Sequence, residues 1–285
     1  MTNQIAAVVV TYNRLNDLKD CLKAISEQTA KADIIVVNNG STDGTKEYLD
    51  SKKGIFVIHQ ENLGGAGGFY AGTRYAFEAG YEWLWMMDDD GLPESNQLKV
   101  LLKMASDYDK KVLNALVVNK EDHTLFAFRD QKPLTSLDLT PEITEEIFCP
   151  FNGTFIHRSV IEKIGFIKKE MFIWGDEGEY MCRIKKNGYH LYTATRAIHY
   201  HPKEKGNKNY AIPILNKGRI LLKPQKMSHY YYRNLGYNAW HYGTILSVIK
   251  QCLLHTTFFV RTGRFSEMKK FYKYYYKGII NDYSI

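Results

Sequence analysis

Apolar runs alternate with stretches of helical spacing along the first third of the chain. Residues 5–10 and 34–37 are continuous apolar runs rich in valine and isoleucine, which is typical of strands buried on both faces. Between them, apolar residues recur at helical spacing over 15–28. The alternation continues with a helix, a strand, a helix and a strand at 45–49, 55–58, 69–79 and 83–87. This β-α-β-α-β-α-β order predicts a parallel sheet with right-handed crossovers.

The pattern is less regular after residue 91. It predicts a helix from Glu94 that continues through 98–104, and a fifth strand over 112–118. Residues 120–148 are mixed and acidic without a clear period, so we interpret them as a variable excursion. Further along, the pattern predicts a strand at 151–156, a short helix at 159–164 and a helix from 176 onward that begins with an acidic cluster. It also predicts two strand segments, at 189–193 and 197–202.

The C-terminal part differs in composition from the rest. Of the net charge of +7, residues 206–285 contribute +11, because 13 Lys+Arg stand against Glu267 and Asp282, while residues 1–205 contribute −4. The tail also holds 11 of the 21 tyrosines, predicts a loop at 203–209 and a helix-like stretch at 244–254, and alternates lysine with aromatic residues over 269–277. Such a tail predicts a surface for an anionic partner, namely membrane lipid, a phosphorylated lipid carrier or nucleic acid. The alternative is a second, small packing layer with a cationic exterior.

Length and cysteine usage narrow the class of protein. A chain of 285 residues suits one large domain, or one domain with an appendage. The four cysteines are scattered without a Cys-x-x-Cys pair, which indicates a reducing compartment and no zinc site. The N-terminus lacks the basic region of a signal peptide, and no apolar run reaches the ~18 residues of a membrane span. We therefore expect a cytoplasmic protein.

The predicted strands end in polar or glycine residues, so these ends converge on one rim, where open α/β sheets bind ligands. Residues 83–87 run directly into Asp88, Asp89, Asp90 and Gly91. Three adjacent carboxylates repel one another unless a cation neutralises them, and their oxygens suit Mg²⁺ or Mn²⁺. The alternative for an isolated Asp-Asp-Asp is a solvated acidic turn.

A glycine-rich stretch at 64–68 can bring backbone N–H groups close to phosphate, because no Cβ obstructs the approach. It is not the first βα turn and lacks G-x-G-x-x-G spacing, which disfavours a Rossmann dehydrogenase. A G-x-x-x-x-G-K-[ST] motif is also missing, which disfavours a P-loop kinase. A second acidic cluster, containing Asp176 and Glu177, stands at the start of a predicted helix, where the helix dipole favours carboxylates. The alternative is that these acids serve only as helix caps.

Seven segments in order resemble the family 2 glycosyltransferases, which have the GT-A fold. They are residues 9–14, 37–44, 62–69, 87–91, 174–183, 197–201 and 232–234, so the likeness covers about 1–240. The sequence Asn-Leu-Gly-Gly-Ala-Gly-Gly-Phe, followed by Asp-Asp-Asp-Gly-x-Pro, looks most like the galactofuranosyltransferases of bacterial cell-surface polysaccharides. The similar rhamnosyltransferases usually carry fewer glycines in the first of these segments.

The resemblance implies an α/β fold with a Rossmann-like, mixed and mainly parallel sheet flanked by helices. It implies a catalytic domain at 1–205, with nucleotide-sugar binding at about 1–119 and acceptor binding at about 120–205. A basic, helical region at 206–285 follows. The activity implied is that of an inverting transferase that uses a UDP-sugar and Mn²⁺ or Mg²⁺, with a glycan or lipid-linked saccharide as acceptor.

The resemblance also assigns residues to roles. The nucleotide-sugar set is Thr11, Tyr12, Arg14, Asn39, Asp43, Asn62, Gly65, Gly67, Gly68, Asp88 and Asp89. The metal set is Asp88 and Asp90 with a histidine after the last strand, either His201, which the ungapped count from the acidic cluster favours, or His199. The acceptor set is Trp174, Tyr231 and Arg233.

A general base is expected in the second acidic cluster, because inverting transfer needs a carboxylate to take the proton of the acceptor hydroxyl. In the family's register the base stands six residues before the helix arginine. Counting back from Arg183 gives Glu177, with Asp176 as the alternative. No covalent intermediate is required, so no activated serine or cysteine is expected.

Three other classes compete with this interpretation. A sugar nucleotidyltransferase typically carries a glycine-rich basic loop after its first strand, which Thr11-Tyr12-Asn13-Arg14 does not provide. A non-catalytic sugar-nucleotide-binding or membrane-scaffolding protein would not need the intact carboxylates. Nucleic-acid binding through the tail is not expected. The partners expected are therefore a UDP-sugar, a saccharide acceptor and an anionic membrane surface at the inner face of the cell membrane. The alternative donor is a dTDP-sugar such as dTDP-rhamnose.

Overall fold

The computed structural model describes residues 4–128, 132–149, 151–203, 208–212 and 218–284. The chain forms two compact units. The first consists of Met1–Lys169 and Arg183–Lys203, and the second of Glu170–Cys182 and Glu204–Ile285. The predicted division near residue 205 differs from this one in the segment Glu170–Cys182, which carries the second acidic cluster and groups with the C-terminal helices.

The first unit contains the strands and helices that the apolar pattern predicts, together with two short strands, β5 and β7, that it does not predict. Its strands are β1 (Ile5–Thr11), β2 (Asp33–Asn39), β3 (Ile55–Gln60), β4 (Trp83–Asp88), β5 (Leu92–Pro93), β6 (Val112–Asn119), β7 (Ile143–Glu145), β8 (Asn152–His157) and β9 (Tyr192–His201). Its helices are α1 (Leu15–Ser26), α2 (Thr45–Asp50), α3 (Gly64–Glu78), α4 (Gln97–Asp107) and α5 (Arg158–Ile164), with a 3₁₀ turn η2 (Leu134–Ser136). The 3₁₀ turn η3 (Lys169–Met171) and helix α6 (Asp176–Lys186) cross the boundaries between the units.

One mixed sheet carries this unit, with the strand order β3-β2-β1-β4-β8-β6-β9-β5 and β7 paired to β9. Pairing is parallel through β3, β2, β1 and β4, as the β-α-β order predicts. Strand β8 pairs antiparallel with β4 and β6, whereas β6 and β9 are parallel. The predicted α/β fold with a mixed sheet flanked by helices is confirmed.

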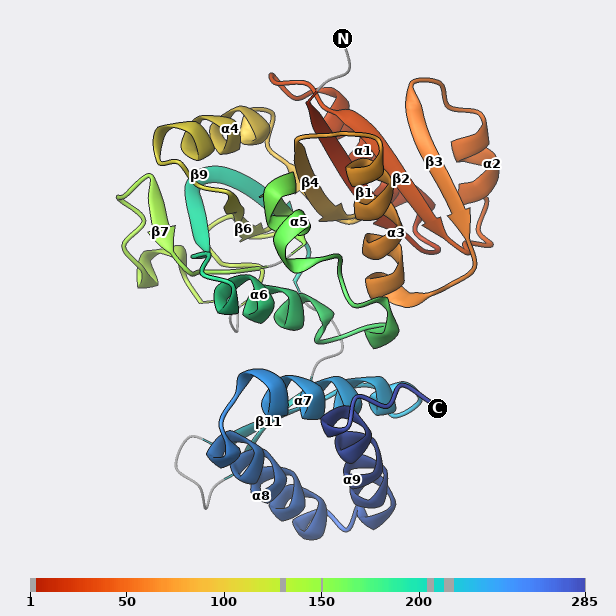
Figure 1. Cartoon of the computed structure of the whole chain (residues 1–285), viewed down its shortest axis with the longest axis vertical. Coiled ribbons are helices and arrows are strands. Elements are labelled where there is room, and N and C mark those ends of the chain that lie inside the picture. The colour runs from red at the N-terminus through yellow and green to blue at the C-terminus, as the bar shows by residue number, and fades with distance from the viewer. Residues whose placement is uncertain (1–3, 129–131, 150, 204–207, 213–217, 285) are drawn as a thin grey trace. The chain divides into compact units, whose positions relative to one another are not determined.

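Helices cover both faces of the sheet. Alternate residues of each strand point to opposite faces, so a continuous apolar strand presents apolar side chains to both. Ala7 and Val9 of β1 belong to a core shared with apolar residues of α1 and α4. Val8 and Val10 point to the other face, where α3 lies against β1 and β2 (Figure 1). This burial on both faces is why the first strands are continuous apolar runs rather than alternating ones.

Helix α3 begins at Gly64, so the predicted helix start at residue 69 was wrong, and the glycine-rich stretch 64–68 is part of the helix. A Cβ on Gly68 would lie 2.4 Å from Cγ1 of Val10, and one on Gly72 would lie 2.5 Å from Cγ1 of Val8. The glycines therefore let the helix backbone approach the sheet closely. Packing on the sheet outweighs the low helix propensity of glycine, which misled the sequence interpretation.

The two predicted strand segments at 189–193 and 197–202 form one strand, β9. Its register against β6 shifts after Ala115, which pairs with Ala194, while Leu116 pairs with Ile198. The residues between Ala194 and Ile198 form a bulge, which interrupts the alternation that marks a strand in sequence. In the acidic excursion, the structure places only the short elements η2 and β7 among the described residues of 120–148.

The second unit is mainly helical. It contains α7 (Ser228–Tyr242), α8 (Ile245–Arg261) and α9 (Phe265–Ile279), with an antiparallel hairpin of β10 (Lys208–Ile212) and β11 (Gly218–Leu222) that the sequence did not predict. Of the loop predicted at 203–209, residues 204–207 lie outside the described residues. A core of aromatic residues holds the helices together, including Tyr232, Phe259 and Phe271. Among the described residues, no helix has the length and apolar character needed to cross a membrane.

Candidate active site

Asp89 ties the end of β4 to the end of β1. Its carboxylate is 3% exposed and accepts hydrogen bonds from the Thr11 hydroxyl at 2.7 Å and from Nη1 of Arg14 at 3.3 Å. Burial raises the pKa of Asp89 to about 6, although the Thr11 hydrogen bond and the charge of Arg14 act in the opposite direction. The Asp89 carboxylate is thus used in hydrogen bonds within the protein. These bonds hold in place the segment that carries its neighbours Asp88 and Asp90.

Asp88, Asp90 and His201 form a group that could hold a metal ion. One ligand atom from each lies within 4.8 Å of the others. The two aspartates come from the end of β4 and the turn behind it, and His201 is the last residue of β9. His201 Nε2 lies 3.1 Å from Oδ1 of Asp90, and Arg14 pairs with the other oxygen, Oδ2. Two carboxylates and an imidazole therefore converge from elements far apart in sequence.

Electrostatics favour the charged forms of the Asp90–His201 pair. Burial opposes ionisation of Asp90, but the hydrogen bond and charge of His201, together with Arg14, outweigh it and lower the pKa of Asp90 to about 2. Burial also opposes protonation of His201, yet Asp90 and Asp88 outweigh it and raise its pKa. Asp90 is therefore a carboxylate at neutral pH, the form that binds a cation.

His199 occupies a different environment from His201. It is fully buried, and its Nδ1 lies 3.4 Å from Oε1 of Gln97. A Cβ on Gly91 would lie 2.2 Å from Nε2 of His199, so the ring packs under the turn that carries Asp90. Burial and the charge of His201 lower the pKa of His199 to about 3, although Asp90 acts in the opposite direction, so the ring is neutral. Both candidate histidines thus lie near Asp90, but the convergent group contains His201.

Asn39 and Asn62 have their side-chain amides engaged inside the rim. Asn39 Oδ1 accepts hydrogen bonds from Nε2 of Gln60 at 2.8 Å and from the backbone N–H of Leu63 at 3.1 Å. Its Nδ2 donates to the carbonyl of Gly64 at 2.9 Å. Asn62 Oδ1 accepts from the Gly64 N–H at 2.9 Å. These contacts hold the start of α3 against β2, a structural use that the predicted nucleotide role did not include.

Some of the other predicted nucleotide-binding residues are already hydrogen-bonded within the protein, and others are accessible to a ligand. Asp43 accepts from the backbone N–H groups of Leu15 at 3.0 Å and Thr45 at 3.2 Å, the first residues of α1 and α2, so it binds the starts of two helices. Tyr12 is 46% exposed beside the rim, and no other atom lies within 4 Å of a Cβ built on Gly65. The first N–H groups of a helix lack intrahelical partners and favour anions, so the N–H groups that follow Gly64, whose own N–H is bonded to Asn62, are candidate donors at this rim.

The second acidic cluster lies at the start of α6 and is described within the second unit. Asp176 and Glu179 are each 2% exposed, and Tyr242 donates a hydrogen bond to Oε1 of Glu179 at 2.7 Å. Glu177 is partly exposed, and its Oε2 accepts from the Gly175 N–H at 3.3 Å. Of the two candidate bases, Glu177 is therefore the more accessible to solvent.

The loop before these acids is held by α7, which the sequence analysis missed. Nδ2 of Asn234 donates to the carbonyls of Met171 at 2.8 Å, Ile173 at 2.9 Å and Trp174 at 3.0 Å. The loop needs such support, because φ is +60° at Trp174 and +111° at Gly175. The signal available in the sequence was the Tyr-Arg-Asn match, from which the resemblance took only Arg233 and Tyr231.

The side chains of the three predicted acceptor-binding residues mostly contact other residues of the protein. Arg233 is 1% exposed and donates to the carbonyls of Glu170 at 2.9 Å and Met171 at 3.2 Å. Tyr231 is partly buried beside the aromatic core, and burial raises its pKa to about 12. Trp174 is partly exposed, with Nζ of Lys223 5.0 Å from its ring centroid. Arg233 thus braces the same loop as Asn234.

Replacement of Asn234 by alanine is expected to loosen this loop. The change removes the amide donor of three carbonyls, of which that of Met171 keeps other donors, Arg233 and the Ile173 N–H, so we expect the free energy of unfolding to fall by about 1–3 kcal/mol. Because Asp176 and Glu177 are the candidate bases, their misplacement should lower kcat by up to about 10²-fold, with little change in the affinity for UDP, the nucleotide that the resemblance implies. Thermal denaturation, steady-state kinetics and UDP calorimetry measure these effects. The matched control is Asn16→Ala, at an exposed position of α1; equal kcat for both variants would contradict the prediction.

Comparison with known proteins decides the family. A family model described as glycosyl transferase family 2 matches residues 6–165, which include the whole β1–β4 rim. The chain belongs to glycosyl transferase family 2. The predicted resemblance is confirmed at this level, and glycosyltransferase activity follows from it.

Two kinds of curated family 2 relatives cover most of the chain. Galactofuranosyltransferase GlfT1 of Mycobacterium tuberculosis is 32% identical over 216 residues, 71% of each chain. GlfT1 of Mycolicibacterium smegmatis is 30% identical over 254 residues, 83% of each chain. The dTDP-rhamnosyl transferase RfbF of Shigella flexneri is 25% identical over 287 residues, 95% of this chain and 93% of RfbF.

Solved structures of the same fold extend the comparison. S. aureus TarS 1–349 superposes with a TM-score of 0.61 at 14% identity and covers 98% of this glycosyltransferase and 81% of that chain. A complex of TarS 1–349 with UDP-GlcNAc gives a TM-score of 0.59 over 90% of this chain and 72% of that chain. This chain spans 43% of a longer TarS structure. At these identities the likeness concerns the fold.

Proposed function

We propose that this glycosyltransferase transfers galactofuranose from UDP-galactofuranose to a hydroxyl of a growing cell-surface glycan or lipid-linked oligosaccharide, with inversion at the anomeric carbon. The observation that carries the donor proposal is the 32% identity to galactofuranosyltransferase GlfT1 over 71% of each chain. The acceptor class follows from the same relationship. The acceptor proposal places the enzyme at the inner face of the cell membrane.

The β1–β4 rim supports the donor-binding part of this proposal. Thr11, Tyr12 and Asp88 lie at the ends of β1 and β4, where an open α/β sheet binds its ligand. The N–H groups at the start of α3 would meet the diphosphate, and Gly65 leaves the approach open. Asn39 and Asn62 would hold that helix start in place. TarS 1–349, which shares the fold, has been solved with UDP and with UDP-GlcNAc.

Asp88, Asp90 and His201 fit a divalent cation. Two carboxylate oxygens and one imidazole nitrogen are ligands that Mn²⁺ accepts readily, and Mg²⁺ also suits the oxygens. A bound cation supplies Lewis-acid neutralisation of the charge that develops on the departing diphosphate. Asp89 and Arg14 would position the ligand carboxylates through the contacts described above. Glu177 would take the proton of the attacking hydroxyl, with Asp176 as the alternative base.

A donor panel tests the proposed donor. Nucleotide release is measured with UDP-galactofuranose, UDP-galactopyranose, UDP-glucose and dTDP-rhamnose, each with Mn²⁺. We expect the highest kcat/KM with UDP-galactofuranose. Preference for dTDP-rhamnose would instead align the enzyme with its relative RfbF, and binding of a donor without turnover would contradict catalysis.

Replacement of each histidine distinguishes their proposed roles. His201→Ala removes a ligand, so the Mn²⁺ concentration for half-maximal activity should rise by more than about tenfold. His199→Ala should lower stability, because the ring is buried, and change the Mn²⁺ requirement less. The control is His190→Ala, whose side chain is 68% exposed. Normal Mn²⁺ dependence in both the His201 and His199 variants would exclude the histidine from the metal proposal.

A further inference from the structure

Helix α8 exposes an apolar stripe on the outside of the second unit. Five large apolar side chains are between 48% and 72% exposed, namely Ile245, Leu246, Ile249, Leu253 and Val260. At about 100° of rotation per residue, these positions fall within an arc of about 100°. The stripe is therefore continuous along one side of the helix.

The opposite side of α8 is already buried in the aromatic core. Val248, Phe258 and Phe259 point there, as do Leu254 and His255. A helix on the surface of a globular protein usually turns polar residues outward, whereas one that is apolar all round is normally buried. The exposed polar residues of α8 are Lys250 and Arg261, and the helix contains no acidic residue. Its outer side thus lacks a covering layer in the described unit, and the exposed polar residues beside it are both cations.

The exposed side of α9 adjoins this stripe. The hydroxyl groups of Thr256 in α8 and Tyr272 in α9 form a hydrogen bond, so the two exposed sides meet along one edge. Tyr272 and Tyr276 are 42% and 61% exposed. Exposed lysines follow between and beside them, at Lys269 and Lys273. Tyrosine and lysine on the flank of an apolar helix are typical of segments that lie at a membrane–water interface.

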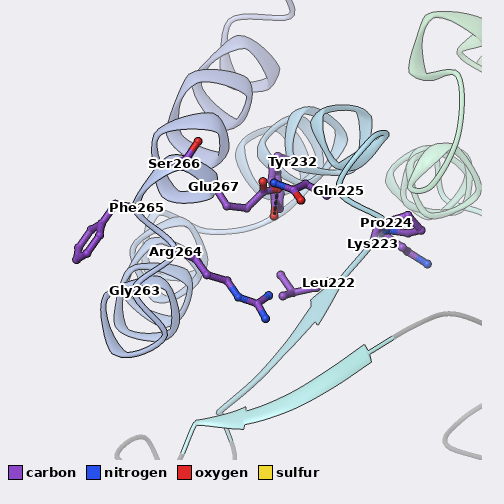
Figure 2. A pocket seen from close by; sticks show the side chains of 10 residues that line it. All are labelled: Leu222, Lys223, Pro224, Gln225, Tyr232, Gly263, Arg264, Phe265, Ser266 and Glu267. Atoms are coloured by element: carbon purple, nitrogen blue, oxygen red, sulfur yellow. Dashed lines mark hydrogen bonds between the residues drawn. The ribbon is translucent and has the colours of Figure 1, made fainter.

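The start of α9 also exposes an apolar side chain next to a basic one. Phe265 is 53% exposed, and Figure 2 shows its ring pointing away from a cavity of about 550 Å³, toward which Arg264 extends. Glu267 points inward, where its Oε1 accepts hydrogen bonds from the hydroxyl groups of Ser228 at 2.6 Å and Tyr232 at 2.9 Å. The Glu267 carboxylate is therefore occupied inside the unit.

The hairpin of α8 and α9 is strongly cationic. Between residues 245 and 279 its basic residues are Lys250, Arg261, Arg264, Lys269, Lys270, Lys273 and Lys277, against Glu267 alone. Two copies of this surface would bring like charges together, which disfavours self-association through it. An anionic lipid surface would instead match the cations at its headgroups and the apolar side chains beneath them.

We propose that the outer side of α8, with the adjoining side of α9, docks on a bilayer that contains anionic phospholipids. Ile245, Leu246, Ile249, Leu253 and Val260 enter the acyl boundary, while Lys250 and Arg261 lie at the headgroups. The inference rests on the proposed function only in its purpose, which is to bring the enzyme to a lipid-linked acceptor. The site itself is carried by the exposure and charge of the hairpin.

Flotation of the full chain with vesicles tests the proposal. Wild-type protein should float with vesicles of phosphatidylcholine and phosphatidylglycerol, and much less with phosphatidylcholine alone. Leu246→Ser combined with Leu253→Ser should weaken this partition by at least about tenfold, because two large apolar side chains no longer transfer from water. Lys250→Gln and Arg261→Gln should each weaken binding to the anionic vesicles by about fivefold and reduce its salt sensitivity.

Phe56→Ser is the matched control, since Phe56 is 45% exposed on β3 in the other unit. Circular dichroism checks that each variant is folded, and UDP calorimetry on the same samples tests the donor proposal separately. Flotation of the Leu246/Leu253 variant at the wild-type level would overturn the docking surface. A wild-type dimer in sedimentation that this variant dissociates, with vesicle binding unchanged, would assign the stripe to self-association instead.

Discussion

Replacement of Asp90 by asparagine is expected to abolish measurable turnover, with kcat falling by roughly 10³-fold or more, since a Lewis-acid contribution is worth several kcal/mol. Asparagine keeps the size of the side chain but removes its charge. The structure shows what depends on that charge. Asp90 faces His201 at 3.1 Å and pairs with Arg14, and it belongs to the convergent group with Asp88. The variant therefore loses a proposed metal ligand and the partner of two cations.

Three measurements separate the proposed metal role of Asp90 from damage to the fold. Thermal denaturation reports folding, calorimetry with Mn²⁺ reports metal binding, and nucleotide release reports turnover. Asp20→Asn, at an exposed position of α1, is the matched control. Treatment of the wild type with EDTA should reproduce the loss, and Mn²⁺ or Mg²⁺ should restore activity. Full activity in EDTA would remove the metal proposal, whatever the Asp90 variant does.

Glu177→Gln is expected to lower kcat by about 10²–10⁴-fold, the usual contribution of a general base, with UDP affinity little changed. Glutamine is nearly isosteric and keeps hydrogen bonding, but it cannot accept the proton of the acceptor hydroxyl. The structure supports Glu177 by its accessibility, because it is partly exposed whereas Asp176 is 2% exposed. Its hydrogen bond from the Gly175 N–H would orient the carboxylate.

Comparison with the neighbouring acid makes this test specific. Asp176→Asn should lower stability more than it lowers kcat, since a buried carboxylate at a helix start supports the fold. Glu47→Gln, at an exposed position of α2, controls for the loss of a glutamate charge. A dead Asp176 variant beside a near-normal Glu177 variant would exchange the two roles. Normal turnover in both would leave the acids as a helix cap.

Much of the first unit could be predicted from the sequence because its signals are local. Continuous valine-rich runs identify strands covered on both faces, and the helices between them fix parallel order in β1, β2, β3 and β4. Polar residues at the strand ends then mark one rim. The same local character explains the errors. Glycines 64–68 have low helix propensity, so the sequence indicated a start of α3 at residue 69, and a bulge after Ala194 divided β9 into two.

The roles of polar side chains depended on contacts that no local pattern contains. Asp89 stands between two candidate ligands, yet only the pairing of β1 with β4 brings it to Thr11 and Arg14. Alternation along a strand puts His199 and His201 on the same side. Their different surroundings come from the turn at Gly91, which packs on His199. Satisfied hydrogen bonds decide which groups remain for a ligand, and partners distant in sequence supply them.

By itself the sequence determined the α/β class, the rim with its three carboxylates, the resemblance to family 2 glycosyltransferases and the excess positive charge of the tail. Only the tertiary structure brings His201, which the sequence count already favoured over His199, to Asp88 and Asp90. It alone decided that Asn234 holds the loop before Glu177, and that α8 is apolar on its outer side as well as its inner one. The physical reason is the range of the interactions. Periodicity and charge are properties of neighbouring residues, whereas convergence, hydrogen-bond satisfaction and exposure arise only when distant segments pack together.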